Sequence, residues 1–508
     1  MNKTAKTILI IFLSIIGITA ILGVVGFGSY LLISNVLDDQ TSIQTPEIGL
    51  NPLEIFTEET DQQEESQEGS ETPPSVDTAS EDMASLFNAF WTTRELLHDN
   101  FINQPVDDHV LANGARQGLL DYLAELDVSL AAVVVPEDAP APEEIAEQAG
   151  TPRELVSLFT LFWETWIKTQ YAELPEEATP SNLMQKAISG MVDSLGDDYT
   201  NYFDPDLAQQ YNTDLSGEYE GIGAWVDTTT DYLTIISPIK DTPAEEAGLE
   251  PGDMVVAIDG EDMTGVDPQI ALKRVLGPAG TEVTLTIKRE GVDEPFDVEI
   301  VRRRIVIPYI ETEILEGNIA YLSLARFYED GEIDFRNALE DLLKEDPDGL
   351  IIDLRANGGG YLHVVVAIAS EFIDDGDILI ERFGDGSTKE YPALRSKGIA
   401  LDIPLVILVD GGSASASEIL AGAIRDYERG VLIGQTTFGK GSVQLPITLP
   451  DEQGLVSITI ARWLTPNGNL IQGVGIEPDI FVELTEEDVE NELDPQLDRA
   501  VEYLINGE

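Results

Sequence analysis

Residues 404–418 read Pro-Leu-Val-Ile-Leu-Val-Asp-Gly-Gly-Ser-Ala-Ser-Ala-Ser-Glu, an apolar strand followed by a loop of small residues, and a helical pattern continues to Tyr427. The same succession occurs upstream, where the apolar strand 349–355 runs into Ala-Asn-Gly-Gly-Gly at 356–360 and then into a helical pattern over 361–373. Each loop therefore precedes the amino end of a helix, where backbone N–H groups lack partners. The pattern predicts an α/β core with a place for an oxyanion.

A serine in such a loop is a nucleophile only if a base accepts its proton. The chain has three histidines, and His363 falls one turn into a predicted helix, which favours a place on the helix surface. The other candidate is Lys440, which lies between glycines in Phe-Gly-Lys-Gly-Ser-Val-Gln (438–444), beside an apolar strand. Burial there would lower the pKa of the lysine. The sequence therefore favours Lys440 as the base and keeps His363 as the alternative.

Residues 216–303 contain short alternating strands around a helical turn that ends at Gly248. This succession resembles a PDZ domain of the bacterial protease type. The resemblance implies that an extended peptide adds to a sheet edge, with its terminal carboxylate held by backbone N–H groups. Gly221, Ile222 and Gly223 form the candidate carboxylate loop, because glycine lets the backbone approach a ligand closely. The alternative is that these glycines serve only a turn or a bulge.

Four further blocks carry a resemblance to a known family. They are Gly-Ser-Ala-Ser-Ala-Ser-Glu-Ile (412–419), Thr-Phe-Gly-Lys-Gly-Ser-Val-Gln (437–444), Gly-Ile-Glu-Pro-Asp (475–479) and Leu-Gly-Asp-Asp-Tyr-Thr (195–200). Together with the PDZ-like module, they resemble the carboxyl-terminal processing (tail-specific) proteases, serine peptidases of the S41 type, over roughly residues 151 to 485. The resemblance implies a Ser/Lys dyad on a ClpP/crotonase-like core.

The resemblance also implies roles for single residues. Ser415 would be the nucleophile, Lys440, 25 residues later, the general base, and Gln444 the residue that orients the base. The neighbouring serines, Ser413 and Ser417, are expected to form a turn and a helix cap.

The oxyanion hole that the resemblance implies consists of backbone N–H groups. One belongs to Ala416 and the other to Gly359 or Gly360. The family usually has proline where this chain has Gly358, so the choice between the two glycines stays open. Three charged residues would either help to hold the site or form ordinary ion pairs: Asp353, Arg355 and Asp426.

The amino-terminal part divides into an apolar and an acidic segment. Thr7 to Leu37 has no charged residue and exceeds the roughly 20 residues that cross a bilayer. Lys3 and Lys6 precede it, which predicts a cytoplasmic amino end and an extracytoplasmic remainder. A cleaved signal peptide is the alternative. Residues 38–83 contain no Lys or Arg and are predicted to be a disordered, acidic stalk.

Residues 84–215 have helical periodicity and match themselves at an offset of 72 residues, for example Phe87 with Phe159 and Gly118 with Gly190. We expect a first repeat at 84–135, a linker at 136–152 and a second repeat at 153–215. The aromatic stripe favours a buried helix face over a ligand groove. The extra copy would be a dimerisation arm of a homo-oligomer or an additional packing layer, and residues 486–508 are expected to be an acidic tail.

Composition excludes several classes of function. The 95 acidic and 28 basic residues give a formal net charge of −67, which would repel nucleic acid. The chain has no cysteine, which excludes disulfides, thiolate catalysis and cysteine-ligated metals. No metal or cofactor is implied.

The sequence as a whole predicts a multidomain protein of α+β and α/β class. It would have one N-terminal transmembrane helix, a helical region, a PDZ-like β domain (216–303) and a ClpP/crotonase-like catalytic core (304–485). The expected function is that of a membrane-anchored, extracytoplasmic serine endopeptidase that captures protein substrates by free apolar carboxyl termini. A non-catalytic PDZ-type scaffold on the same fold is the alternative. A crotonase-like acyl-transfer enzyme would need a basic coenzyme patch, which this acidic chain does not suggest.

Overall fold

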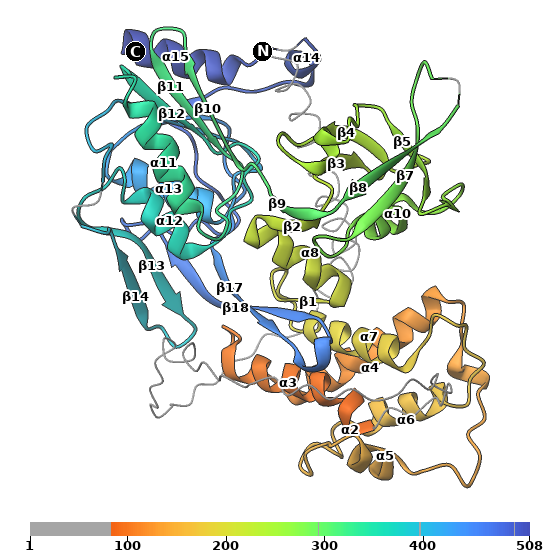
Figure 1. The fold of residues 1–508 in the computed structure, drawn as a ribbon. Helices are drawn as coiled ribbons and strands as arrows, with labels where there is room; N and C mark the ends of the chain where they lie inside the picture. Colours follow the sequence, from red (N-terminus) through yellow and green to blue (C-terminus); the bar gives the residue numbers. More distant parts are fainter. Residues whose placement is uncertain (1–82, 293, 396–397, 492, 508) are drawn as a thin grey trace, which may run out of the picture. The chain divides into compact units, whose positions relative to one another are not determined.

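The computed structural model describes residues 83–508 except 293, 396–397, 492 and 508 (Figure 1). The predicted transmembrane segment, Thr7 to Leu37, lies outside the described residues, and so does the predicted stalk up to residue 82. Among the helices of the described part, none is long and apolar enough to cross a membrane.

The helical region follows the predicted repeat, with α3 and α4 in the first copy and α6 and α7 in the second. Its elements are α2 (Met83–Leu86), α3 (Asn88–Asn100), α4 (Asp108–Glu125), the 3-10 helix η2 (Leu130–Ala132), α5 (Pro142–Gln148), α6 (Thr160–Thr169) and α7 (Pro180–Asp193). The stretch 136–152, for which composition predicts a linker, contains α5. Its Ala146 and Ala149 are buried, and the Trp91 indole donates a hydrogen bond to the Ala149 carbonyl at 2.9 Å. This stretch is therefore packed against the first copy.

Aromatic contacts between the two copies are reciprocal. The ring of Phe87 lies 6.1 Å from Phe162, and the ring of Phe90 lies 6.0 Å from Phe159. Phe90 and Phe162, which correspond to each other in the repeat, stack at 5.2 Å. Such an exchange of contacts defines an isologous interface. The copies therefore pack about an approximate two-fold axis, as two subunits of a dimer do, within one chain.

Glycines bring α4 and α7 together in the same reciprocal manner. A Cβ atom at Gly114 would lie 2.4 Å from the carbonyl oxygen of Gly190, and one at Gly118 would lie 2.2 Å from that of Lys186. Gly114 and Gly118 correspond to Lys186 and Gly190 at the offset of 72 residues. Only residues without a side chain permit this separation of the helix backbones.

The part that resembles a PDZ domain is a β domain with two short helices. Its sheet has the strand order β3-β4-β5-β7-β8, with β6 paired to β5, while β2 pairs with β9. In β7, Val283, Leu285 and Ile287 are buried, as alternation along a half-buried strand predicts. Its elements and those that lead into it are β1 (Asn201–Phe203), α8 (Pro205–Ser216), β2 (Glu218–Gly221), β3 (Ala224–Asp227), β4 (Thr234–Pro238), α9 (Pro243–Glu246), β5 (Met254–Ile258), β6 (Glu261–Asp262), α10 (Pro268–Val275), β7 (Glu282–Lys288), β8 (Phe296–Val301) and β9 (Arg303–Val306).

The core is built on a sheet of order β10-β11-β12-β15-β16-β19. The strands are β10 (Ile310–Leu315), β11 (Ile319–Leu324), β12 (Gly349–Asp353), β15 (Leu405–Val409), β16 (Val431–Gly434) and β19 (Ile480–Phe481), and the helices between them are α11 (Gly331–Leu343), α12 (Leu362–Ala369) and α13 (Ala416–Asp426). β11, β12, β15 and β16 run parallel. Their carboxyl ends therefore share one edge, where the loops that follow them meet.

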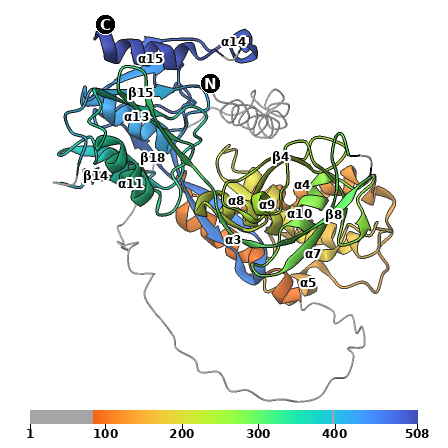
Figure 2. The same ribbon diagram turned by 45° about the horizontal axis from the view of Figure 1, so that its top comes forward.

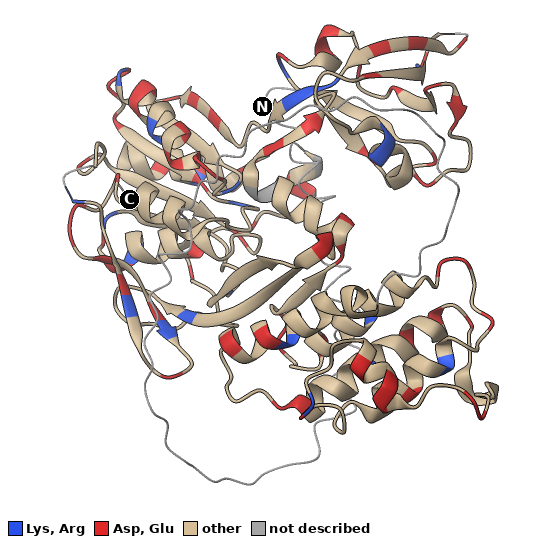
Figure 3. Cartoon of the chain, turned by 60° about the horizontal axis from the view of Figure 1, so that its bottom comes forward, with Lys and Arg blue, Asp and Glu red and all other residues tan. Residues whose placement is uncertain are grey.

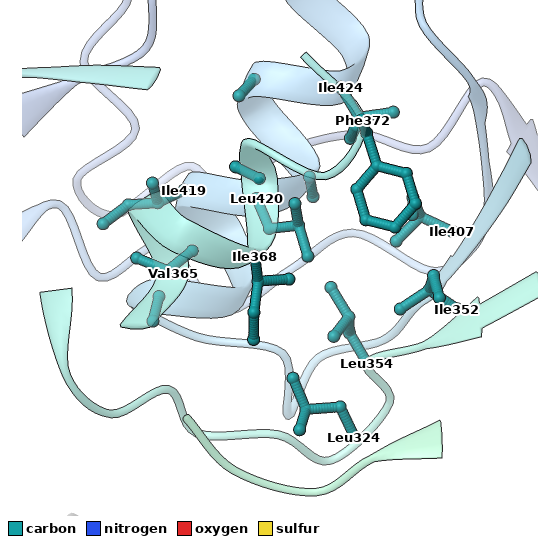
Figure 4. Packing of buried hydrophobic residues seen from close by; sticks show 14 of the residues in the cluster. Leu324, Ile352, Leu354, Val365, Ile368, Phe372, Ile407, Ile419, Leu420 and Ile424 are labelled. Atoms are coloured by element: carbon teal, nitrogen blue, oxygen red, sulfur yellow. The ribbon is translucent and has the colours of Figure 1, made fainter. Parts of the chain in front are cut away.

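Helices cover both faces of this sheet. Strand residues such as Ile352 and Ile407 pack against Val365 and Ile368 of α12 and against Leu420 of α13 (Figure 4). The other face carries α15 (Pro495–Asn506), and β15 lies between α15 and α13 in Figure 2.

The expectation of an acidic tail at 486–508 is thereby corrected. The segment forms α14 (Glu486–Glu490) and α15, and Leu497, Ala500 and Leu504 of α15 join an apolar cluster on the sheet. Acidic residues on the exposed side of α15 conceal this apolar stripe in the composition.

A second, antiparallel sheet lies beside the first. It has the order β1-β18-β13-β14, with β17 also paired to β18. The new elements are β13 (Asp377–Phe383), β14 (Thr388–Pro392), β17 (Ser442–Thr448), the 3-10 helix η3 (Pro450–Glu452) and β18 (Leu455–Leu464). Val456 and Ile458 of β18 pack into the aromatic cluster of the helical region. The protein is thus a mixed α+β structure, with the helical region packed against the core.

Candidate active site

Ser415 lies at the tip of the turn between β15 and α13. It directly precedes the first residue of α13, and its backbone has φ 53° and ψ −112°, a conformation that residues with side chains rarely adopt. Residues 416–424 are buried, while Ser415 is partly exposed. The sharp turn therefore leaves Ser415 partly exposed at the start of the helix, and the N–H of Ala416, in the first turn of α13, has no helical partner.

The two flanking serines are fully buried and bonded to the chain. Ser413 Oγ donates to the Leu354 carbonyl at 2.8 Å, and Ser417 Oγ donates to the Asn357 carbonyl at 2.8 Å. Ser413 has its expected place in a turn. The expectation that Ser417 caps the helix is wrong, because α13 begins at Ala416 and Ser415 occupies the cap position.

Lys440 lies in the loop between β16 and β17, and hydrogen bonds hold this loop on both sides. The Lys440 backbone N–H donates to Glu418 at 2.9 Å, and its carbonyl accepts the Trp463 indole N–H at 3.0 Å. Gly439 has φ +91°, and a Cβ there would lie 2.9 Å from the backbone nitrogen of Gly475. The glycine before the lysine is thus required for this close approach.

The surroundings of the Lys440 ammonium group favour its neutral form. Burial first, and then the positive charge of Arg326, lower the pKa of Lys440, while the carboxylates of Glu418 and Asp197 oppose this shift. The Lys440 Nζ lies 5.2 Å from the centre of the Tyr199 ring. Tyr199 and Asp197 belong to the block 195–200, so this segment supplies part of the lysine's environment.

Glu418 connects the serine and lysine segments, and the sequence patterns did not single it out for this role. Its buried carboxylate accepts hydrogen bonds from Ser415 N (2.9 Å), Lys440 N (2.9 Å), Gly439 N (2.7 Å) and Thr437 Oγ1 (2.6 Å). Burial raises the pKa of Glu418, and these four donors oppose the rise. The available signal was a carboxylate three residues after the serine, which is equally typical of an ordinary capping box.

Asn357 connects the glycine loop (356–360) to the turn that carries Ser415 by hydrogen bonds. Its fully buried side chain accepts the Gly359 N–H at 2.9 Å and donates to the Leu324 carbonyl at 2.7 Å. Its carbonyl accepts the Ala414 N–H at 3.0 Å. The loop that follows β12 is therefore bonded both to the end of β11 and to the nucleophile turn.

The three glycines of this loop have different surroundings. A Cβ at Gly359 would lie 2.8 Å from Ser415 Cβ and 3.0 Å from the Ala416 nitrogen, whereas one at Gly360 would collide with the Phe327 carbonyl oxygen at 2.0 Å. A Cβ at Gly358 would meet nothing within 4 Å. Gly359 is thus the glycine directly beside Ser415 and Ala416, although its own N–H is bonded to Asn357.

The remaining candidates lie farther from this arrangement. Gln444 donates to Ser442 Oγ at 2.8 Å, and among the described residues no hydrogen bond joins it to Lys440. Likewise, no hydrogen bond in the described part joins Ser415 Oγ to Lys440 Nζ. His363 is exposed on α12, with its ring 5.3 Å from that of Tyr361, as a surface position predicts.

Of the three charged residues with two possible roles, Asp353 and Arg355 form an ion pair, and Asp426 accepts a backbone hydrogen bond. Arg355 pairs with Asp353 at 2.6 Å and with Asp494 at 2.8 Å. Burial lowers the pKa of Arg355, but the two carboxylates outweigh this effect and keep the pKa well above its usual range. Asp426 accepts the Asn467 N–H at 2.9 Å at the end of α13. These bonds tie strand and helix ends to neighbouring segments.

The candidate carboxylate loop lies between β2 and β3. Gly223 has φ +84°, and a Cβ there would lie 2.4 Å from that of Thr242; Ile222 is buried. The ring of Tyr219 lies over Gly221, where a Cβ would approach it to 2.9 Å. Burial raises the pKa of Tyr219 to about 12, and the N–H groups of Ala224 and Gly223 face its oxygen. The phenol thus occupies the side of the loop that would receive a carboxylate.

A small cavity of about 20 Å³ adjoins this loop and is lined by Tyr219, Ile222, Ala224, Leu272 and Leu276, among others. Its walls are apolar and come from β2, β3, β4, β5, β7 and α10. Among the described residues, no group of three or more His, Asp or Glu side chains is placed to hold a metal ion.

Comparison with known proteins gives matches in both the core and the β domain. The profile of peptidase family S41 matches residues 318–482, and a PDZ domain profile matches residues 234–289. The carboxy-terminal-processing protease of Bartonella bacilliformis is 39% identical over 325 residues, which are 62% of this chain and 73% of that protein.

Two further similarities cover much the same residues. Carboxy-terminal processing protease CtpB of Bacillus subtilis is 37% identical over 316 residues, which are 61% of this chain and 65% of that protein. The solved photosystem II D1 C-terminal processing protease is 26% identical, with a TM-score of 0.39, and the match covers 73% of this chain and 93% of that one.

Proposed function

Because this chain belongs to the carboxy-terminal processing proteases, PDZ-containing serine peptidases of family S41, we propose that it cleaves protein substrates with Ser415 as nucleophile and Lys440 as base. Membership confirms the family that the sequence blocks resemble. The observation that carries the proposal is the carboxylate of Glu418, which accepts the backbone N–H of Ser415 and that of Lys440, each at 2.9 Å. One buried anchor therefore holds both segments.

In the first half of the reaction, neutral Lys440 Nζ accepts the proton of Ser415 Oγ as the oxygen bonds to the scissile carbonyl carbon. The electron pair of the carbonyl moves to its oxygen, and the Ala416 N–H stabilises this oxyanion. The carbon–nitrogen bond then breaks, and Lys440 gives its proton to the leaving amine. Water then attacks the ester carbon of the acyl-enzyme, and Lys440 accepts a proton from this water. When the ester bond breaks, Lys440 returns the proton to Ser415 Oγ, and the new carboxyl end of the substrate leaves.

The lowered pKa of Lys440 suits this role. A lysine accepts a proton only in its neutral form, and burial together with Arg326 increases the neutral fraction near physiological pH. Gln444 would act as a positioning residue, because it lies on β17 four residues after the base. Gly359 and Gly360 are the candidates for the second contributor to the oxyanion hole: Gly359 lies directly beside Ser415, but its N–H would first have to leave Asn357.

Substrate choice would begin in the PDZ domain. The small apolar cavity beside Gly221, Ile222 and Gly223 has the chemistry for an apolar terminal side chain and would have to widen to admit one, and the backbone N–H groups of the loop suit a terminal carboxylate. A substrate tail would have to displace the Tyr219 hydroxyl from these groups.

The proposal is tested with the full chain in detergent and an unfolded protein that ends in an apolar tail. We expect cleavage near the carboxyl terminus by the unaltered chain and none by Ser415→Ala. Ser387→Ala, in the exposed turn between β13 and β14, is the matched control and should cleave normally. Equal cleavage by Ser415→Ala would contradict the assigned nucleophile, and peptide binding without cleavage would support the scaffold alternative.

We also propose that the chain is a single-pass membrane protein whose catalytic part is extracytoplasmic. The proposal depends on the uncharged segment from Thr7 to Leu37 and on Lys3 and Lys6 before it. Proteolysis of intact cells or spheroplasts should digest the catalytic part and leave an amino-terminal fragment in the membrane fraction. Complete protection in intact spheroplasts, with digestion only after lysis, would contradict this orientation.

A further inference from the structure

Arg326 follows β11 at the sheet edge where the active-site loops meet. The next residue, Phe327, donates its N–H to the Gly359 carbonyl at 3.0 Å and accepts the Tyr361 N–H at 2.8 Å. These two bonds clamp the end of β11 to the glycine loop, and Gly359 of that loop lies against Ser415. The side chain of Arg326 therefore originates next to the proposed active site.

Arg326 has no carboxylate partner in the described part of the chain. No ion pair within 4 Å involves it, and its buried Nε has no hydrogen-bond partner there. Arg355, at the end of the neighbouring strand β12, has two carboxylates instead. Acidic residues greatly outnumber basic ones in this chain, and Figure 3 shows them on helices and strands throughout. Arg302 and Arg429 also lack a carboxylate partner, but both donate hydrogen bonds to backbone carbonyls, whereas Arg326 makes no side-chain hydrogen bond among the described residues. Its buried N–H is costly to leave unsatisfied.

The charge of the Arg326 guanidinium acts on one lysine and two tyrosines. Its charge lowers the pKa of Lys440, and it also opposes the rise in pKa that burial gives to Tyr211 of α8 and to Tyr361. The side chain thus lies within electrostatic reach of the proposed base and of two phenols. Glu418 and Asp197 act on Lys440 in the opposite direction, and Glu329 acts on Tyr361. None of these carboxylates is bonded to Arg326.

We propose that Arg326 binds a carboxylate of the substrate beside the scissile bond, so that the enzyme prefers substrates with an acidic group at that point. The inference deepens the proposed function and rests on it. A guanidinium offers a planar pair of N–H donors that matches a carboxylate, and such charge-assisted bonds are among the stronger ones in proteins. The carboxylate belongs to an Asp or Glu side chain, or to the chain end when the bond cleaved is very near the terminus.

Peptide pairs that differ only in charge test this subsite. Glu is placed in turn at each position on either side of the scissile bond, and Gln replaces it in the partner peptide. A third series keeps Gln and compares a free with an amidated carboxyl end. We expect kcat/KM to favour Glu over Gln at one position by roughly tenfold to a hundredfold. A preference confined to the third series would identify the chain end as the source of the carboxylate.

Variants of the full chain separate the subsite from an effect on the base. Arg326→Gln should abolish the Glu preference, Arg326→Lys should keep part of it, and Arg395→Gln, whose side chain is 80% exposed, should keep all of it. Loss of the Arg326 charge also raises the pKa of Lys440, which moves the acid limb of the rate profile to higher pH for both peptides alike. A preference that persists in Arg326→Gln, or its absence in the unaltered chain, would overturn the proposal.

Binding to an inactive variant keeps this test apart from that of the proposed function. Fluorescent Glu and Gln peptides are titrated against Ser415→Ala and against Ser415→Ala with Arg326→Gln. We expect tighter binding of the Glu peptide only where Arg326 is present, even if neither peptide is ever cleaved. Cleavage without any charge preference in rate or binding would refute the subsite alone, whereas charge-selective binding without cleavage would refute the proposed function alone.

Discussion

Close backbone approach through glycine occurs in two regions of this protein and has a different consequence in each. In the helical region, Gly118 and Gly190 bring α4 against α7 among apolar and aromatic side chains. In the core, Gly359 and Gly439 bring loops together among hydrogen bonds to Asn357 and Glu418. The first region holds two helices by packing, and the second positions polar groups. Changes in the helical region should therefore lower stability, and changes in the core should lower activity first.

The largest effect is expected for Glu418→Gln. The amide keeps one acceptor but presents an NH₂ group to donors that the carboxylate accepted, so the serine and lysine segments shift relative to each other. We expect kcat/KM to fall roughly a hundredfold to a thousandfold, because small misplacements of reacting groups have effects of this size. The measurement is kcat/KM across pH for the variant and the unaltered chain.

The pH profile distinguishes positioning from a general loss of structure. The Glu418 carboxylate opposes the lowering of the Lys440 pKa, so its removal lowers that pKa further. The acid limb of the remaining activity should therefore move to lower pH in Glu418→Gln. A reduced rate with an unchanged limb would indicate only structural damage, and an unchanged rate would refute the role of Glu418.

A smaller effect, on stability, is expected for Gly190→Leu. A Cβ at this position would lie 2.4 Å from the Gly114 carbonyl oxygen, so the helices must separate. Overpacking of this kind lowers the free energy of unfolding by about 1 to 3 kcal/mol. Gln117→Leu, on the exposed side of α4, is the matched control and should change stability little. Thermal unfolding of the three proteins checks this, and equal melting temperatures would contradict the packing described here.

The smallest effect is expected for Tyr219→Phe in the PDZ domain. Loss of the hydroxyl leaves the Gly223 and Ala224 N–H groups free for a peptide carboxylate. Affinity for a peptide with a free apolar end should rise roughly twofold to tenfold, as for the loss of one competing hydrogen bond. Tyr232→Phe, whose hydroxyl bonds Thr264 in the same domain, is the control and should bind normally. Weaker or unchanged binding by Tyr219→Phe would show that the phenol does not compete with the substrate.

The sequence located both segments that meet at Glu418, because parallel strands place their following loops at one edge. It did not identify Glu418 itself. The four donors to that carboxylate come from positions 415 and 437–440, and only folding brings these positions together. Asn357 escaped notice for the same reason, since its partners lie on β11 and in the loop after β12.

Periodicity revealed the duplication but not the way in which the copies pack. The offset of 72 residues identified corresponding residues, while the exchange of contacts between Phe87 and Phe162 and between Phe90 and Phe159 depends on tertiary structure. The described contacts agree with a packing layer, and a dimerisation arm stays a prediction. Composition predicted only an acidic tail at residues 486–508, because acidic side chains there outnumber the few apolar side chains of α15 that contact the sheet.

The central claim is that Lys440 in its neutral form activates Ser415. The most direct test measures the rate at which a fluorophosphonate labels the full chain from mildly acidic to alkaline pH, with intact mass as the readout. Peptide mapping then identifies the labelled residue. We predict a single label on Ser415, a rate that rises with pH to a midpoint below the usual lysine pKa, and slow labelling without this pH dependence in Lys440→Met. Equally fast labelling of Lys440→Met with an unchanged pH profile would contradict the claim.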